Sequence, residues 1–276
     1  MEERGLKLVG SKTKAAVEKS MEILGLKIDR NLTFIQHAEK AVEKASRMAE
    51  KLNRLMWNTG GPRGGKRRAI ASAMNNMMLY GSEVWRSAIR TRKVRELVDR
   101  LQRKMALKIA AAYRTVSITN LFMVISARFE GKNNREVLNA WEAEWQARES
   151  WTKSVIGHLN RWTKRKRGET NYFVTKFLTG HGQNGVYLKK IQKREHDRCK
   201  DCGATDDAGH GILYCPRWEA ERWPAAIKIG EILEDGNVIG IMLETEDKWR
   251  IIEQWIVQII GTREREARAE VGNRQE

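Results

Sequence analysis

The stretch His37–Met56 reads HAEKAVEKASRMAEKLNRLM, and it decides the fold class because its apolar residues recur at every third or fourth position. That spacing places them on one face of a helix and the charged residues on the other. The apolar positions are Ala38, Ala41, Val42, Ala45, Met48, Ala49, Leu52, Leu55 and Met56. The run Asn58-Thr59-Gly60-Gly61-Pro62 then stops the pattern. The stretch therefore predicts one long amphipathic helix.

Similar spacing predicts helices further along the chain. One is expected at about 66–80, where the methionines Met74, Met77 and Met78 belong to the core, and one at about 92–112. Residues 130–160 look like a Trp-rich helix, and Trp249–Ile260 predicts an amphipathic helix near the C-terminus. The charged residues 262–276 are expected to be disordered.

A short β element is expected before the first helix. Ile23, Leu26 and Ile28 flank Gly25 and are followed by the turn signal Asp29-Arg30-Asn31, which favours a strand or hairpin within residues 20–35. The sequence thus predicts a mainly α fold, a helical bundle with a short β element at its N-terminus.

Composition limits the function classes. The chain has 276 residues with 52 Lys+Arg against 35 Asp+Glu, a net charge of +17, and 41% hydrophobic residues, enough for a real core. Such an excess favours a polyanionic partner, RNA or DNA. No apolar run approaches membrane-spanning length. Because the N-terminus lacks an apolar signal core, we expect the nucleus or cytoplasm rather than secretion.

The positive charge is concentrated in two segments. Residues 63–114 hold 14 basic residues and three acids, and residues 161–198 hold 11 basic residues and three acids. Surface helices that are merely solvated usually mix the two signs, so we expect these segments to contact phosphates. The candidate nucleic-acid contacts are Arg63, Lys66, Arg67, Arg68, Lys93, Arg100, Lys104, Lys108, Arg114, Lys164, Arg165, Lys166 and Arg167.

The most specific motif is Cys199-x2-Cys202-x7-His210-x4-Cys215, which contains all three cysteines of the chain. Thiolate and imidazole are preferred zinc ligands, and four of them close a tetrahedral structural site that leaves no position for a catalytic water. We therefore expect a structural Zn2+ ion. Because the segment has little apolar material, chiefly Ile212, Leu213, Tyr214 and Trp218, we also expect the metal to supply most of its order.

The other histidines and the tryptophans have plainer interpretations. His37 and His158 are expected to be structural, His196 to be a solvated neighbour of the cysteines, and His181 to lie in a tight turn between helices. Trp141, Trp145 and Trp151 could stack on bases, but tryptophans at helical spacing more often pack in a core. The pair Asp206-Asp207 is interpreted as turn residues.

The order of several motifs resembles a known family. The motifs are Gly5-Leu6-Lys7-Leu8 with Ser11-Lys12-Thr13, Leu24–Asp29, Leu32-Thr33-Phe34 with His37, Gly60-Gly61-Pro62, Leu79–Trp85, Ala112–Ser117, Leu178–Gly182 and His210–Trp218. Together, over about residues 5–225, they resemble the C-terminal part of the polyprotein of non-LTR (LINE-type) retrotransposons, in the group that includes elements inserting into ribosomal DNA. The resemblance implies, in order, the late palm motif, the primer grip, the thumb of the reverse transcriptase and a Cys-Cys-His-Cys zinc knuckle.

The resemblance also implies a domain division. It assigns 1–36 to a remnant of the palm and primer grip, 37–117 to a helical thumb, 118–195 to a helical basic linker, 196–220 to the CCHC zinc knuckle and 221–276 to a C-terminal helix and charged tail. The bundle would then derive from a polymerase thumb, which holds the primer–template duplex by its backbone.

The chain departs from the family in its catalytic motif. These polymerases need an aromatic-Ala-Asp-Asp box to hold two metal ions, and the only adjacent aspartates here, Asp206-Asp207, follow Thr205. The family usually has an acid just before the knuckle histidine, where this chain has Gly209. We therefore expect a truncated fragment without the catalytic palm, inactive as a polymerase on its own.

Two other functions remain open at this point. One is a nuclear adaptor that binds proteins through its Trp-rich helices, which a mixed-charge exterior with an apolar groove would favour. The other is a nucleic-acid enzyme of an unrecognised type, although no Ser-His pair, P-loop or set of paired carboxylates with a base supports it.

Overall fold

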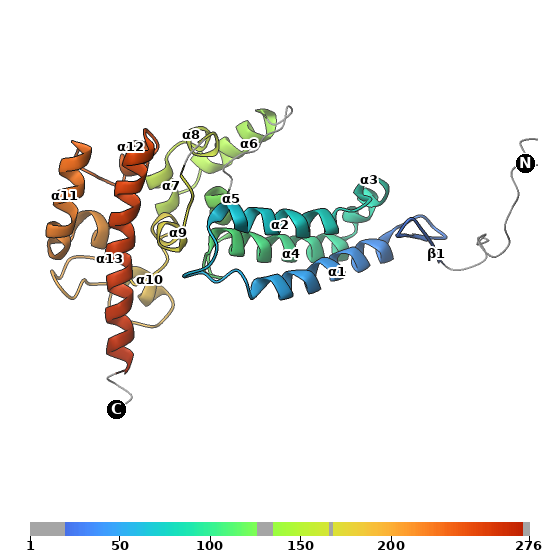
Figure 1. The fold of residues 1–276 in the computed structure, drawn as a ribbon, viewed down its shortest axis with the longest axis horizontal. Helices are drawn as coiled ribbons and strands as arrows, with labels where there is room; N and C mark the ends of the chain where they lie inside the picture. Colours follow the sequence, from blue (N-terminus) through green and yellow to red (C-terminus); the bar gives the residue numbers. More distant parts are fainter. Residues whose placement is uncertain (1–19, 126–134, 166–167, 273–276) are drawn as a thin grey trace, which may run out of the picture. The chain divides into compact units, whose positions relative to one another are not determined.

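The computed structural model describes residues 20–125, 135–165 and 168–272, and helices dominate these ranges. The described residues divide into two compact units (Figure 1). The first contains the residues up to Met56 together with Arg68–Met105, and the second contains Trp57–Arg67 together with the residues from Ala106 onward. The motifs at residues 5–13 and the candidate contacts Lys166 and Arg167 lie outside the described residues.

The first unit begins with the expected hairpin. Strands β1 (Ser20–Ile23) and β2 (Leu26–Asp29) pair antiparallel, with Ser20 opposite Asp29 and Ile23 opposite Leu26. The two-residue turn has positive φ at both Leu24 and Gly25, the conformation that a tight hairpin turn requires. The predicted β element is confirmed.

The helices of the first unit follow the predicted periodicity. They are α1 (Ile35–Asn53), most of α2 (Gly64–Met78), α3 (Ser82–Trp85), the 3-10 turn η3 (Arg86–Arg90) and most of α4 (Arg92–Ala110), whose residues 64–67 and 106–110 belong to the second unit. Met74 and Met78 of α2 are buried, as predicted for core residues, and Met77 is half-buried. Trp85 is fully buried beside His37, whose ring lies 6.2 Å away and whose Nδ1 accepts a hydrogen bond from the Lys27 backbone at 3.1 Å. The expectation of a structural His37 is therefore confirmed.

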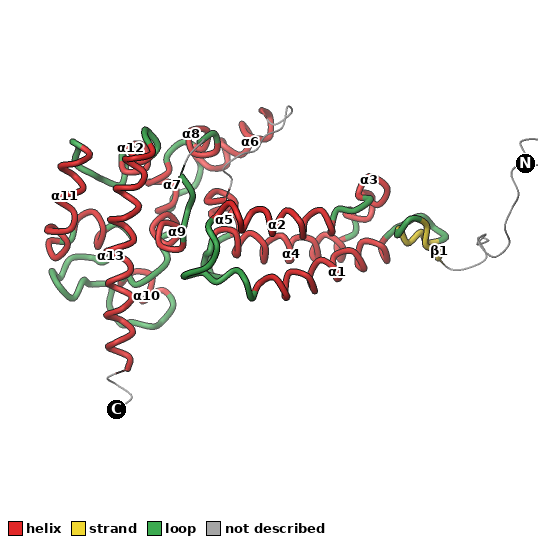
Figure 2. Tube along the Cα trace, viewed as in Figure 1, coloured by secondary structure: helices red, strands yellow, loops and turns green. Residues whose placement is uncertain are grey.

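The second unit is a larger helical assembly, and Figure 2 draws the helices of both units in red. Its elements are α5 (Ile118–Ile125), α6 (Arg135–Gln146), α7 (Trp151–Ile156), α8 (Leu159–Thr163), α9 (Tyr172–Thr179), α10 (Gly185–Lys190), η4 (His210–Tyr214), η5 (Pro216–Trp218), α11 (Glu219–Ile229), α12 (Val238–Met242) and α13 (Glu246–Gly272). Helix α13 is central, because α9, α11, α12 and η4 all pack against it (Figure 1). Among the described residues, no helix combines the length and apolarity needed to cross a bilayer.

Two sequence expectations in this unit were wrong. The Trp-rich stretch is not one helix: Ser150 interrupts it and caps α7 by accepting a hydrogen bond from the Lys153 backbone. The charged tail is not disordered from residue 262, because α13 continues to Gly272. Side chains of this tail pair with the loops that carry the cysteine motif, and local composition does not show such long-range ion pairs.

Candidate metal centre

The first two cysteines lie on a tight hairpin-like turn. The Cys199 N–H donates to the Ala204 carbonyl at 2.7 Å, the Gly203 N–H donates back to the Cys199 carbonyl at 2.9 Å, and a β-bridge joins Arg198 to Thr205. Gly203 has φ +75°, a conformation that glycine adopts without strain. The Cys-x2-Cys spacing followed by glycine thus forms a turn that presents two sulfur atoms.

The other two candidate ligands come from a turn of unusual pitch. Residues His210–Tyr214 form the π-helical turn η4, and the Cys215 N–H donates to the His210 carbonyl, five residues earlier, at 2.7 Å. The Asp207 side chain starts this turn by accepting hydrogen bonds from the Gly209 and His210 backbone. The interpretation of Asp207 as a turn residue is therefore confirmed.

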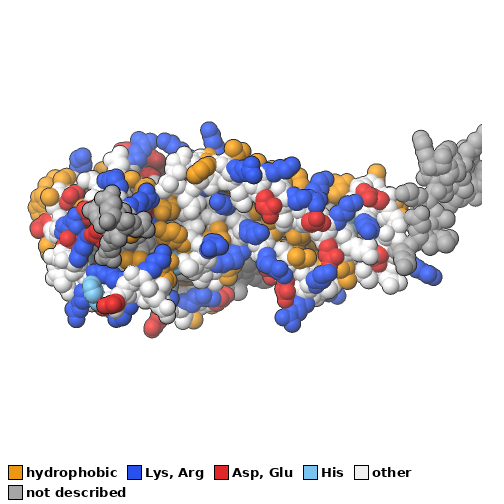
Figure 3. All heavy atoms as spheres, turned by 90° about the horizontal axis from the view of Figure 1, so that it is seen from below, with side chains coloured by type: hydrophobic (Ala, Val, Ile, Leu, Met, Phe, Trp, Pro, Cys, Tyr) orange, Lys and Arg blue, Asp and Glu red, His pale blue; other side chains and the backbone are white. Residues whose placement is uncertain are grey.

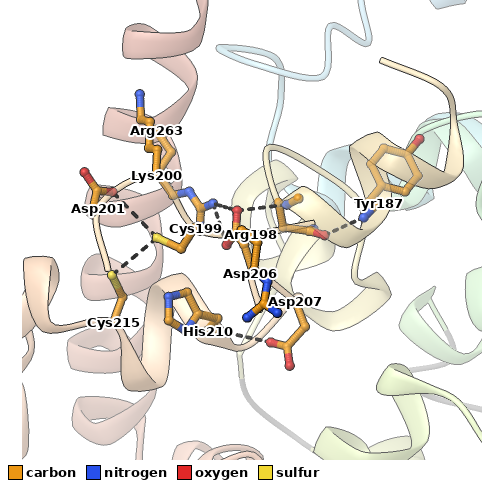
Figure 4. Close-up of polar contacts among 12 residues, drawn as sticks. Tyr187, Arg198, Cys199, Lys200, Asp201, Asp206, Asp207, His210, Cys215 and Arg263 are labelled. Carbon is orange, nitrogen blue, oxygen red and sulfur yellow. Dashed lines mark hydrogen bonds and ion pairs between the residues drawn. The ribbon is translucent and has the colours of Figure 1, made fainter. Parts of the chain in front are cut away.

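The four predicted ligands converge, and Figure 4 shows three of them, Cys199, His210 and Cys215. One ligand atom from each of Cys199, Cys202, His210 and Cys215 lies within 4.8 Å of the other three. The Cys199 and Cys215 sulfurs are 3.9 Å apart, and the Cys202 sulfur is 3.2 Å from His210 Nε2. Ligands at zinc–sulfur bond length in a tetrahedron lie roughly 3.8 Å apart. The cluster can therefore hold a metal ion at its centre.

The electrostatics of the cluster are those of a cation site. The pKa of the Cys215 thiol is raised to about 12, chiefly by burial and also by the nearby thiols of Cys199 and Cys202, against a backbone hydrogen bond that lowers it. A bound cation attracts the thiolates and offsets the repulsion between them. Metal binding therefore deprotonates such thiols. The arrangement is therefore suited to a divalent ion.

Ion pairs surround the cluster and link it to α13. Arg217 donates to the Asp201 carboxylate at 3.0 Å and also pairs with Glu266, while the Cys199 sulfur lies 3.8 Å from Asp201. Lys200 pairs with Glu270 of the same helix. The turn that carries the first two cysteines is thus attached to the C-terminal part of α13.

Asp206 is the centre of a second, buried contact. Its carboxylate is 1% exposed and accepts two hydrogen bonds from Arg263 at 2.6 and 2.8 Å and one from the Gly185 backbone at 2.8 Å. The interpretation of Asp206 as a turn residue is incomplete, because its side chain also joins the cysteine turn to α10 and α13. No local pattern marks Arg263 or Asp206 for this role, since they are separated by 57 residues.

Close packing explains why glycine, Gly209, precedes His210. A Cβ on Gly209 would lie 2.5 Å from the ring of Trp151. That ring is fixed by a hydrogen bond from its Nε1 to the Phe177 carbonyl and by an edge contact with the Phe177 ring. An acid at this position, as in the resembled family, does not fit in this packing.

The remaining histidines stand apart from the ligand set. His196 is exposed, in agreement with its interpretation as a solvated neighbour. His181 lies between α9 and α10, where its Nδ1 is 2.7 Å from the Thr179 carbonyl, as a turn residue would. His158 is exposed at the start of α8.

Most of the candidate nucleic-acid contacts are accessible. Exposed side chains belong to Arg63, Lys66, Lys93, Arg100, Lys104, Arg114 and Lys164, whereas Arg68 and Lys108 are half-buried. Lys93 is paired with Glu39 and Arg100 with Glu96. Figure 3 shows Lys and Arg side chains spread over one face of the molecule, with fewer acids among them.

Two of the predicted contacts are buried and serve the fold instead. The Arg67 guanidinium donates to the backbone carbonyls of Trp57, Pro62 and Lys108. Arg165 stacks 3.7 Å over the ring of Trp162 and donates to the Trp162 carbonyl. Because both guanidinium groups are enclosed and hydrogen-bonded within the chain, neither can face a phosphate without local rearrangement.

The fold and the site define a mainly helical, strongly basic protein with a Cys3His cluster that can hold a metal ion. The chain is similar to a curated protein of Nasonia vitripennis described as a retrovirus-related Pol polyprotein from type-1 retrotransposable element R1 4. The two are 23% identical over 263 residues, which cover 77% of this chain and 64% of the relative. The chain thus spans less than two thirds of that relative's length. No family model and no solved structure matches it.

Proposed function

We propose that the chain is the nucleic-acid-binding part of a retrotransposon polyprotein related to RNA-directed DNA polymerases, built around a structural zinc site. The similarity to a Pol polyprotein supports the retrotransposon relationship. The thumb and zinc-knuckle assignments rest on the order of the sequence motifs, and the helical content agrees with them.

Exposed positive charge on α4 is the observation that carries nucleic-acid binding. The helix buries Val94, Val98 and Leu101 and leaves Arg100 and Lys104 in solvent. Cationic side chains on one face bind phosphates by releasing counterions, without reading base sequence. We therefore expect weak sequence preference on RNA or DNA.

Zinc is the proposed metal because three thiolates and one imidazole form a soft, closed ligand set. Four protein ligands leave no position for a catalytic water, so the ion holds the two turns together. With no aromatic-Ala-Asp-Asp box in the sequence, we expect this chain not to extend a primer on its own.

The adaptor hypothesis assumed that the tryptophans of the Trp-rich helices bind proteins, and the structure does not favour this. Trp145 is fully buried and its Nε1 donates to the Gly157 carbonyl, while Trp141 and Trp151 are half-buried and pack against the same core. These tryptophans serve mainly to pack the second unit.

Salt dependence and charge reversal test the proposal. Binding of a labelled single-stranded or duplex oligonucleotide to the full chain should weaken about 10³–10⁵-fold between about 50 and 200 mM salt, if about 6–10 phosphates are contacted. Reversing the charges of Lys93, Arg100, Lys104 and Lys108 should weaken binding of all sequences alike and make the salt dependence shallower.

The control variant reverses Lys44, Lys51, Arg250 and Arg265, four exposed residues outside the two basic segments, for the same change in net charge. It should bind much more tightly than the α4 variant. Equal weakening by both sets would mean that only the total charge matters, and a flat salt dependence would contradict the proposal.

A further inference from the structure

Helix α11 exposes an apolar stripe that the fold does not use. Its inner face buries Ala225 and Ile229 against the core, and the helix packs on α13. Its outer face carries Trp223 and Ile227, one helical turn apart, which are 62% and 64% exposed.

Neighbouring residues extend the stripe into a patch. Ile232, just beyond α11, is 78% exposed, and Tyr214, whose hydroxyl is fixed on Asp235 at 3.2 Å, is 48% exposed. We call Tyr214, Trp223, Ile227 and Ile232 the α11 patch. By contrast, Trp249 and Trp255 of the same unit are buried. Contiguous large apolar side chains in water mark interaction surfaces, whereas single exposed ones are ordinary.

The rim of the patch has the opposite sign to the chain as a whole. Residues 219–236 contain five acids and two basic residues, in a chain whose net charge is +17. Glu219 lies one turn before Trp223, and Glu231 follows the C-cap Gly230 of α11, where it pairs with Lys248 at 3.1 Å. Glu234 and Asp235 lie beside Ile232.

The two basic residues of this region do not neutralise the rim. Arg222 points inward, where its guanidinium donates to the carbonyls of Ile212 and Cys215 at 3.4 and 3.2 Å. That leaves Lys228 as an exposed cation in residues 219–236. Because phosphates are repelled by such a rim, the patch is unsuited to nucleic acid, in contrast to α4.

We propose that the α11 patch is a docking surface for a basic amphipathic helix of a partner protein. The partner's apolar face covers Trp223 and Ile227, whose spacing of one turn matches the spacing of anchors on a helix. Its lysines or arginines meet Glu219 and Glu234, which sets orientation and excludes acidic partners. The proposal does not depend on nucleic-acid binding.

A pair of model peptides tests the proposal on the full, metal-loaded chain. One is an amphipathic helix of leucine and lysine, and the other has the same pattern with glutamate in place of lysine. The total charge of the protein favours the glutamate peptide, so only a local acidic site can favour the lysine peptide. We expect fluorescence anisotropy to show at least about tenfold tighter binding of the lysine peptide, weakening as salt is added.

Variants then localise the binding. Trp223→Ala and, separately, Ile227→Asn should weaken it about tenfold, and Glu219→Lys with Glu234→Lys should remove the preference for lysine. Trp57→Ala is the matched control, because Trp57 is 69% exposed and distant in sequence from the patch, and it should bind like the wild type. Circular dichroism and metal content should be unchanged in all of these variants, since the side chains are exposed.

Three results would overturn the proposal. The first is no preference for the lysine peptide, or a preference that survives Trp223→Ala. The second is self-association of the wild type that Trp223→Ala abolishes, which would make a second copy the occupant. The third is a loss of oligonucleotide affinity in Trp223→Ala but not in Trp57→Ala, which would make the tryptophan a base-stacking residue.

Discussion

At the scale of single residues, buried polar side chains link segments that are distant in sequence. The link that His37 makes is sensitive to pH. Burial, the largest cause, and the nearby charge of Lys40 lower its pKa below the ordinary value of 6.5, while a backbone hydrogen bond and Glu22 raise it. Its neutral Nδ1 accepts the Lys27 N–H and so joins β2 to α1. Protonation would remove that acceptor.

The sign of the pH effect follows from this lowered pKa. Below pH 6.5 the unfolded chain binds a proton more readily than the folded one, so the contribution of His37 to stability is complete above pH 6.5 and falls as the pH drops. The loss is at most about 1.4 kcal/mol per pH unit. In the wild type we expect the protection of α1 amides from hydrogen exchange to decline between about pH 7.5 and about pH 5, after correction for the intrinsic pH dependence of exchange. In His37→Gln this decline should be flatter.

His158→Gln is the control, because His158 is exposed and its replacement should leave the pH profile as in the wild type. A wild-type profile that is flat over this range would contradict the prediction.

At the scale of elements, the C-terminal part of α13 supports the metal centre. Arg263 is the main partner of the buried Asp206 carboxylate, with Arg194 further away at 3.8 Å. Arg263→Met would leave a buried carboxylate poorly compensated, which typically costs about 3–5 kcal/mol. We expect a comparable loss in the free energy of unfolding of the second unit, and weaker metal retention in competition with a chelator, because Asp206 positions the cysteine turn.

Arg265→Met is the matched control for this prediction. Arg265 lies two residues further along the same helix, is exposed and donates to Thr262 of its own helix. Equal chelator sensitivity of the two variants would show that the Asp206 contact does not support the site.

At the scale of the whole molecule, the metal is expected to matter to one of the two units. Ile212, Leu213 and Trp218 of the metal-binding turns belong to the hydrophobic core of the second unit, together with residues of α9 and α13. The sequence expectation that the segment has little to fold around therefore underestimates its packing. Because the turns share this core, metal loss should loosen the second unit beyond residues 196–218.

We expect one zinc per chain by elemental analysis, and its loss in Cys202→Ser. Zinc binding is worth on the order of 10 kcal/mol in comparable small sites. Hydrogen exchange after chelation should therefore rise in η4, α11 and α13 and stay unchanged in α1, which lies in the first unit. Full zinc retention in Cys202→Ser, or an equal rise of exchange in α1, would contradict the assignment.

Local patterns in the sequence were enough to find the long helices of the first unit, the apolar part of α13, the hairpin and the four converging ligands. Helical and strand periods are properties of neighbouring residues, and a metal site with ligands between Cys199 and Cys215 is nearly local as well. Only the tertiary structure decided which charges face solvent. Arg67 and Arg165 have the same local character as their exposed neighbours, yet backbone carbonyls brought close by the fold enclose them. The same reason explains the charged tail of α13: its order comes from ion pairs such as Arg263–Asp206, whose partners are far apart in the chain and meet only when it folds.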